Sequence, residues 1–162
     1  MNSVFLLLGG NIGNTNQFFI NATGQISEKI GSVITKSSLY QTEPWGFECS
    51  QYFLNQVLEI STELQPIEIL ENCKTIEKNL GRTLKTINDY ESRVIDIDIL
   101  FYNNEIFTSN DLIIPHPRLH LRKFTLLPLN EVIPDFIHPQ LNKKISKLLE
   151  ECEDNGFCKI FI

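Results

Sequence analysis

The 162-residue chain lacks the long apolar segments of membrane proteins and the leader of secreted ones. None of its apolar runs approaches the roughly 20 residues that a membrane-spanning helix needs. The N-terminal segment MNSVFLLLGGNIGN is apolar only over residues 4–8, without a basic leader region or a small-residue cleavage site. We therefore interpret this segment as a first strand, and we expect a cytoplasmic protein without membrane association.

Paired cysteines are also missing. The four cysteines are scattered and form no Cys-x-x-Cys pair. In a cytoplasmic protein this spacing predicts free thiols, and it argues against a zinc site. The cysteines are Cys49, Cys73, Cys152 and Cys158.

Positive charge is scarce and unevenly placed. The net charge is −6 and the isoelectric point about 5.1, which disfavours binding to DNA or RNA. Only four residues are arginines, and all lie between residues 82 and 122: Arg82, Arg93, Arg118 and Arg122. Arginine suits bidentate recognition of phosphate, so the cluster indicates a phosphate site. A chance cluster in a lysine-rich composition is the alternative.

The length suits one domain, residues 1–162, with a single core. Apolar periodicity predicts the order strand, helix, strand, strand, helix, strand. This is the ferredoxin-like βαββαβ core of an α+β protein: an antiparallel sheet with helices on one face and the other face open for a ligand. Additional strands and helices should follow it. We expect the core strands at residues 4–8, 32–40, 52–63 and 94–101, and the core helices at residues 15–30 and 66–80. The additional elements are a strand at residues 105–107 that returns to pair with the last core strand, and helical segments at residues 124–132 and 145–151.

The segment SRVIDIDIL, residues 92–100, places two carboxylates in an otherwise buried strand. Because strand residues i and i+2 share a face, Asp96 and Asp98 should lie together on the open face, with the isoleucines opposite them. Neighbouring carboxylates repel each other unless a cation lies between them, and hard oxygen ligands suit Mg²⁺. The alternative is a half-exposed strand with two solvated aspartates. The nearby Arg93, His116 and Arg122 favour a metal and polyphosphate site.

The same segment resembles the signature of the 6-hydroxymethyl-7,8-dihydropterin pyrophosphokinase family. Five other segments are similar to the family's motifs and follow its order. They are LGGNIGN (8–14), YQTEPWG (40–46), FLNQV (53–57), IEKNLGR (76–82) and PHPRLHLRKF (115–124).

The family transfers pyrophosphate from ATP to the hydroxymethyl group of the pterin and releases AMP, a step of folate biosynthesis. The resemblance therefore implies a Mg²⁺-dependent diphosphokinase with ATP as co-substrate. It implies that Asp96 and Asp98 hold two Mg²⁺ ions, and that Arg82 and Arg93 are catalytic residues at the phosphates.

The resemblance also implies contacts to the nucleotide from Glu77, His116 and Arg122, together with Arg82 and Arg93. For Glu77, a solvent-exposed helix glutamate is the alternative interpretation.

For the pterin, the resemblance implies stacking by Phe53 and Phe124. A flat ring rich in donors and acceptors also needs polar groups at its edge. Asn55, two residues after Phe53, suits this role, and backbone groups around Thr42 and Trp45 would complete the edge. Ordinary core packing is the alternative for both phenylalanines.

Three positions depart from the family's pattern. Leu84 stands where a second arginine is frequent, with Lys85 beside it. Gly10 stands where serine is common, and Ser92 where proline is common.

Two other functions remain open. A metal-dependent nucleotidyltransferase or phosphatase would use the same aspartates and arginines, and a ferredoxin-like sensor or RNA-binding module would need no catalysis. We expect small-molecule substrates, no nucleic acid, and a monomer or weak dimer.

Overall fold

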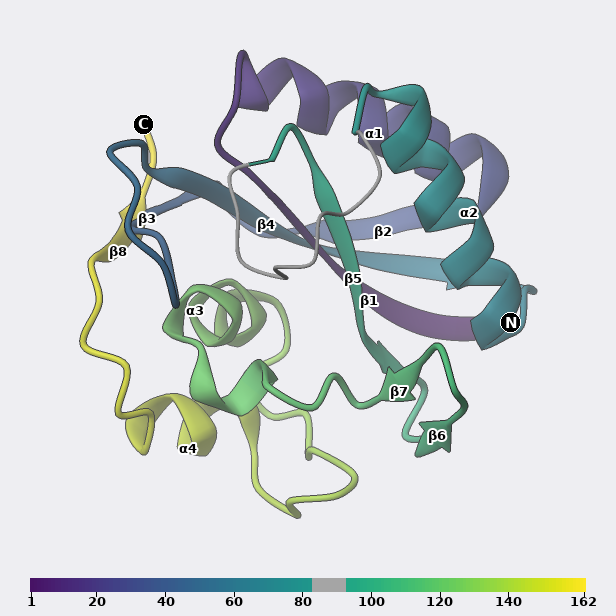
Figure 1. Ribbon diagram of the computed structural model, residues 1–162. Coiled ribbons are helices and arrows are strands. Elements are labelled where there is room, and N and C mark those ends of the chain that lie inside the picture. Colours follow the sequence, from purple (N-terminus) through teal and green to yellow (C-terminus); the bar gives the residue numbers. More distant parts are fainter. Residues whose placement is uncertain (83–92) are drawn as a thin grey trace.

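The structure, a computed structural model, describes residues 1–82 and 93–162 (Figure 1). An antiparallel sheet organises these residues, with the strand order β5-β1-β4-β3-β8 and β2 also paired with β4. The βαββαβ order and the antiparallel sheet predicted from the sequence are confirmed. The strands are β1 (Asn2–Gly10), β2 (Ser32–Lys36), β3 (Tyr40–Thr42), β4 (Phe53–Thr62), β5 (Asp96–Tyr102) and β8 (Cys158–Ile160).

Helices α1 (Thr15–Lys29) and α2 (Pro66–Asn79) cover one face of this sheet (Figure 1). Asn14 caps α1 by accepting the backbone N–H of Gln17, and α2 begins with a proline at its first position. Gly81, with φ of +98°, follows the end of α2 in a left-handed conformation that favours glycine. Apolar side chains of both helices pack on alternate residues of the central strands and form the first core.

The other face is less open than predicted. Helices α3 (Lys123–Val132) and α4 (Ile145–Glu150) pack against part of it, preceded by a 3₁₀ turn, η1 (Leu119–Leu121). Leu126 and Leu129 of α3 are fully buried against Val57 and Phe101 in a second core. The central strands carry apolar side chains on both faces of the sheet, so helices must cover both faces. The part of the second face that α3 and α4 leave uncovered forms a pocket.

The strand predicted at residues 32–40 is divided in two. β2 and β3 both pair with β4, and Ser37 still donates its backbone N–H to the Val57 carbonyl, but residues 38 and 39 lie outside both strands. The backbone N–H and the hydroxyl of Ser38 donate to the Glu131 carboxylate of α3, each at 2.9 Å, and the Tyr40 hydroxyl donates to the same carboxylate. At Ser38, the Glu131 side chain of α3 therefore takes the place of a hydrogen-bond partner on a neighbouring strand.

One further expectation about strands was wrong. The segment after β5 does not return to pair with it, because β6 (Phe107–Thr108) pairs with β7 (Ile113–Ile114) instead. Additional strands were expected after the core, and β8, which pairs with β3, is one of them, although its position was not predicted. The four cysteines are free thiols, as expected. Among the described residues, none of the helices is long and apolar enough to cross a membrane.

Candidate active site

Strand β5 presents its two aspartates to one side of the sheet, as its alternation predicted. Ile95, Ile97 and Ile99 are at most 5% exposed and belong to the first core, whereas Asp96 and Asp98 are part-exposed and line a pocket on the opposite face. The register places Asp96 beside Gly9 of β1 and Asp98 beside Leu7.

Asp96 is paired with two arginines, which corrects the expectation of two mutually repelling carboxylates. Arg82 donates to one carboxylate oxygen of Asp96, and Arg93 donates to the other at 2.7 Å. All three side chains are less than 20% exposed. The two guanidinium groups neutralise the charge that Asp98 would otherwise face.

Glu77 also belongs to this charge cluster, and its interpretation as a solvent-exposed helix glutamate was wrong. It lies on the buried side of α2, accepts the backbone N–H of Ile97 at 2.7 Å, and contacts the Arg82 guanidinium at 2.8 Å. Burial and the neighbouring Asp96 carboxylate raise the pKa of Glu77 to about 7.

The glycine-rich segment after β1 positions Arg93. Asn11 accepts the backbone N–H of Arg93 at 2.8 Å, and the Arg93 carbonyl accepts the backbone N–H of Asn11. A Cβ on Gly10 would lie 2.5 Å from the Val94 carbonyl oxygen. A serine would not fit this backbone, which gives the glycine at this position a physical reason.

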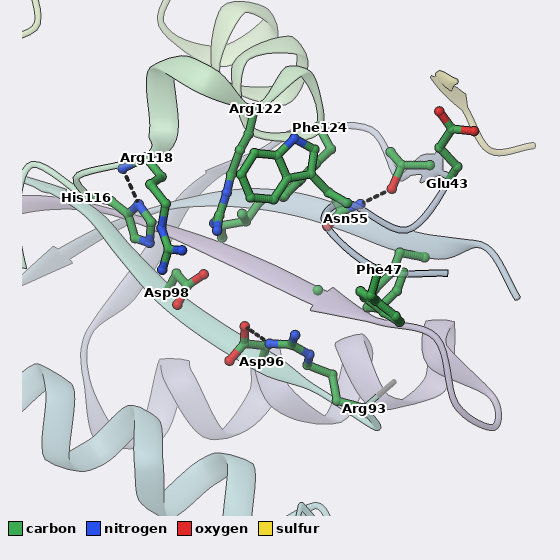
Figure 2. A pocket seen from close by; sticks show the side chains of 15 residues that line it. Glu43, Phe47, Asn55, Arg93, Asp96, Asp98, His116, Arg118, Arg122 and Phe124 are labelled. Carbon is green, nitrogen blue, oxygen red and sulfur yellow. Dashed lines mark hydrogen bonds and ion pairs between the residues drawn. The ribbon is translucent and has the colours of Figure 1, made fainter. Parts of the chain in front are cut away.

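Three basic side chains from the segment before α3 face the aspartates. Figure 2 shows Arg118 and Arg122 directed toward Asp98, with His116 beside them. The His116 Nδ1 accepts the backbone N–H of Arg118 at 3.2 Å. Burial and the nearby Arg122 lower the pKa of His116 to about 4, so the imidazole is neutral at pH 7.

The other end of the pocket is aromatic. Phe53 and Phe124 both line it and both remain part-exposed, unlike ordinary core phenylalanines. The Phe124 ring lies 6.5 Å from the Trp45 ring, edge to face. The Arg122 guanidinium lies 4.7 Å above the Trp45 ring, within cation–π distance.

Polar groups suited to the edge of a flat ring lie next to these aromatics. The Asn55 side chain is 3% exposed and donates to the Thr42 hydroxyl at 2.8 Å. Gly9 lies between Asn55 and Asp96 in the sheet register, and a Cβ there would approach the Asn55 amide oxygen to 3.2 Å. Two strand spacings, about 10 Å, therefore separate the backbone positions of Asn55 and Asp96, and the residue between them, Gly9, has no side chain.

One pocket of about 280 Å³ joins the charged and the aromatic ends (Figure 2). It contains most of the predicted site residues: Thr42, Trp45, Phe53, Asn55, Arg93, Asp96, Asp98, His116, Arg122 and Phe124. Arg82 and Glu77 do not line it and instead contact Asp96 and Ile97 from behind. Leu84, Lys85 and Ser92 lie outside the described residues.

Several residues that line the pocket were not predicted from the sequence, namely Leu7, Gly9, Glu43, Phe47 and Arg118. Arg118 belongs to the arginine cluster between residues 82 and 122, so the argument that selected its three neighbours also applied to it. Glu43 and Phe47 lie in or beside the YQTEPWG segment, but nothing in their spacing pointed to a pocket.

The two aspartate carboxylates suit a hard divalent cation whose remaining coordination positions are filled by oxygens of the substrate. Mg²⁺ commonly takes one or two protein carboxylates and fills its other positions with water and phosphate oxygens. No group of three or more His, Cys, Asp and Glu side chains within the described ranges could hold a metal alone. A cation at Asp96 and Asp98 would thus depend on substrate oxygens.

Comparison with known proteins identifies the family. The model of the 7,8-dihydro-6-hydroxymethylpterin-pyrophosphokinase (HPPK) family matches residues 5–134. The chain is 40% identical over 139 residues to a 2-amino-4-hydroxy-6-hydroxymethyldihydropteridine pyrophosphokinase of Porphyromonas gingivalis, covering 85% of this chain and 94% of that protein. For the Aquifex aeolicus protein of the same name, the identity is 37% over 160 residues, covering 99% and 98%.

Longer proteins contain the same domain. The chain is 39% identical over 153 residues to the Pneumocystis carinii folic acid synthesis protein fol1, covering 94% of this chain but 20% of that protein. A Plasmodium falciparum HPPK-DHPS structure has a TM-score of 0.77 at 20% identity, covering 93% of this chain and 44% of that one. This structural similarity supports the fold, and the family match and the bacterial relatives show that the chain belongs to the 7,8-dihydro-6-hydroxymethylpterin-pyrophosphokinase family.

Proposed function

We propose that this chain transfers pyrophosphate from ATP to the hydroxymethyl group of 6-hydroxymethyl-7,8-dihydropterin, with AMP as the second product, in folate biosynthesis. The observation that carries the proposal is that one pocket has a charged end for a polyphosphate and an aromatic end for a flat ring. Each end alone would fit many ligands, but a transfer between a nucleotide and a pterin needs both.

At the aromatic end, the residues would select the pterin. Phe53 and Phe124 would offer their ring faces for stacking. The side chains of Asn55 and Thr42 are hydrogen-bonded to each other. When the pterin binds, hydrogen bonds to donors and acceptors at the ring edge would partly replace this bond. The backbone around Trp45 would complete that edge.

At the charged end, the residues would bind and orient the triphosphate. Arg93 and Arg122 line the pocket, and Arg82 reaches it through Asp96. Guanidinium groups held in place before the reaction can stabilise charge on the transferred group without rearrangement. His116 would contact the nucleotide as a neutral imidazole, and Glu77 would keep Arg82 oriented.

Asp96 and Asp98 would hold Mg²⁺. When bound, the cation would supply charge neutralisation and alignment of the phosphate chain with the attacking hydroxyl. The Arg82 and Arg93 contacts to Asp96 would then be shared with, or transferred to, the phosphates.

Residues 1–162 would form one domain that acts as a monomer or weak dimer on small molecules. The pairing of β8 with β3 supports the one-domain division, because the C-terminal segment completes the same sheet. The cytoplasmic location stays a prediction.

Product analysis distinguishes this function from its rivals. The purified chain is incubated with ATP, the pterin and Mg²⁺, and the nucleotides are separated by chromatography. AMP formed in equal amount to a pterin diphosphate is the expected result. ADP or free phosphate without a modified pterin would indicate a phosphatase or a simple kinase, and pterin binding without turnover would indicate a sensor.

A further inference from the structure

A segment beyond the family match, residues 154–158, lies against the back of the aromatic end of the pocket. Figure 1 shows the chain after α4 running past α3 to β8 at the edge of the sheet, next to β3. We call residues 154–158 the strap. The family match ends at residue 134, so the resemblance assigns no role to this segment.

The strap is attached to the β3 side of the pocket. Glu43 follows β3, and its carboxylate accepts the backbone N–H of Phe157 at 3.1 Å. In return, the Phe157 carbonyl accepts the backbone N–H of Glu43, and Cys158 pairs with Thr42 in the sheet.

The strap is also attached to the start of α3. One carboxylate oxygen of Asp154 accepts the backbone N–H of Lys123, the first residue of α3, at 3.0 Å. The helix has no side-chain cap of its own, so Asp154 caps it from a distant part of the chain. The second Asp154 oxygen accepts the Gly156 N–H at 2.9 Å, which fixes the bend between the two attachments.

The two attached elements are the two sides of the proposed pterin site. A void of about 30 Å³ separates the strap from the pocket, and Thr42, Glu43, Trp45 and Phe124 line both spaces. Phe124 is the residue after Lys123, and Trp45 is two residues after Glu43. The spacing between the walls that would hold the pterin thus depends on contacts made behind them.

We infer that Asp154 is a positioning residue of the pterin site, which joins the start of α3 to the loop after β3 through the strap. It does not line the pocket and would not touch substrate. The inference rests on the proposed function for the identity of the ligand, but not for the geometry.

The test removes the Asp154–Lys123 hydrogen bond from each side. Asp154→Ala removes the acceptor. Lys123→Pro removes the donor N–H at the first helical position, where proline is tolerated, and the extended backbone of Arg122 suits a following proline. Lys123→Ala keeps the N–H and is its control. Glu153→Ala is the control for Asp154, because the neighbouring carboxylate is exposed and makes no hydrogen bond within the described residues.

Calorimetric titration of the pterin, with a non-hydrolysable ATP analogue and Mg²⁺ present, should show a Kd about tenfold higher for Asp154→Ala and for Lys123→Pro. The double variant should be no weaker than either single variant, since both lose the same bond. ATP affinity should fall less than pterin affinity, because Arg122 is the one residue proposed for the nucleotide that lies next to Lys123, whereas Arg93 and His116 lie on elements that the strap does not touch. Both controls should bind like the unmodified chain.

Trp45 is the only tryptophan of the chain, so its fluorescence reports the pocket wall without any ligand. Greater acrylamide quenching of Trp45 in Asp154→Ala than in Glu153→Ala is expected. Unchanged pterin affinity in folded Asp154→Ala, or an equal loss of pterin and ATP affinity, would overturn the inference. If the unmodified chain binds no pterin, the proposed function fails, and unchanged Trp45 quenching in Asp154→Ala would then overturn the positioning role by itself.

Discussion

The Glu77 carboxylate accepts the backbone N–H of Ile97 at 2.7 Å, so a helix side chain is fixed to the strand residue between the two aspartates. The same carboxylate contacts Arg82, which in turn binds Asp96. The charged end of the pocket is therefore supported from behind by Glu77 and Arg82, while Arg93 binds Asp96 from within the pocket lining.

Replacement of Asp98 by asparagine should abolish most turnover and preserve the fold. The amide keeps the shape of the side chain but loses the charge that would hold a cation, so kcat should fall by at least about 100-fold. AMP formation at saturating Mg²⁺ measures this loss. Asp111→Asn, at an exposed position outside the pocket, is the control. Turnover by Asp98→Asn close to that of the unmodified chain would remove this residue from the metal site.

The two aspartates should differ in their effect on stability. Asp96→Ala removes two ion pairs of less than 20% exposed side chains and leaves two guanidinium groups facing each other. We expect a loss of about 1–2 kcal/mol in the free energy of unfolding, measured by urea titration without Mg²⁺. Asp98→Ala should cost less. If mutual repulsion of the aspartates dominated instead, Asp96→Ala would have an unchanged or raised free energy of unfolding, and this outcome would contradict the role of the two ion pairs.

Phe124→Ala should weaken pterin binding. The loss of stacking and of buried area should together cost about 1–3 kcal/mol of binding free energy. Calorimetry with a non-hydrolysable ATP analogue measures the affinity. Phe18→Ala, on the first turn of α1 and outside the pocket, controls for the general loss of a phenylalanine. Unchanged affinity in folded Phe124→Ala would assign this ring to packing alone.

Nucleotide binding should strengthen pterin binding. Asp96 already binds both Arg82 and Arg93, so repulsion between these arginines in the empty site is not the reason. The phosphates would instead draw these arginines into the pocket and complete its wall, so the coupling should be about 1–3 kcal/mol. Pterin titrations with and without the ATP analogue measure it, and adenosine, which lacks phosphate, should give no increase. Equal affinities in all three would exclude coupling.

From the sequence we also predict that bound ATP orders residues 82–92, and that Lys85 and Leu84 compensate for the second arginine that is frequent at position 84. Residues 83–92 lie outside the described residues, so both stay predictions.

Stability should fall at acidic pH through His138. This imidazole is 2% exposed and its Nδ1 accepts the backbone N–H groups of Gln140 and Leu141. Burial, with the nearby His120, lowers the pKa of His138 from 6.5 to about 4. The unfolded chain therefore binds the proton more readily, so the stabilisation is complete above pH 6.5 and is lost as the pH falls toward 4.

The expected loss from this residue is about 2 kcal/mol between pH 6.5 and 4, measured by urea titration at several pH values. His138→Asn should flatten this dependence in part, since His116 contributes in the same direction. His120→Asn, which replaces a half-exposed histidine, should keep most of it. An unchanged dependence in His138→Asn would exclude this group as a cause.

Local periodicity was enough to predict the main elements. The alternation around Asp96 and Asp98 has a period of two and separates carboxylates from isoleucines in any half-buried strand, so their common face did not depend on the rest of the fold. The caps at Asn14 and Gly81 and the proline at position 66 are likewise local signals of helix ends. The order of the sequence motifs was enough to identify the family and to predict most of the residues that line the pocket.

Contacts between distant residues decided the rest. Arg82 binds Asp96 only because the end of α2 and β5 lie side by side, and the burial of Glu77 depends on the Ile97 amide, 20 residues away. The break between β2 and β3 follows from Glu131 of α3, and β8 is a three-residue strand whose hydrogen bonds come entirely from β3. The sequence determined which helix or strand each segment could form by itself. The tertiary structure determined which residues and strands pair with each other, because ion pairs and the pairing of edge strands produce no periodic pattern in the sequence.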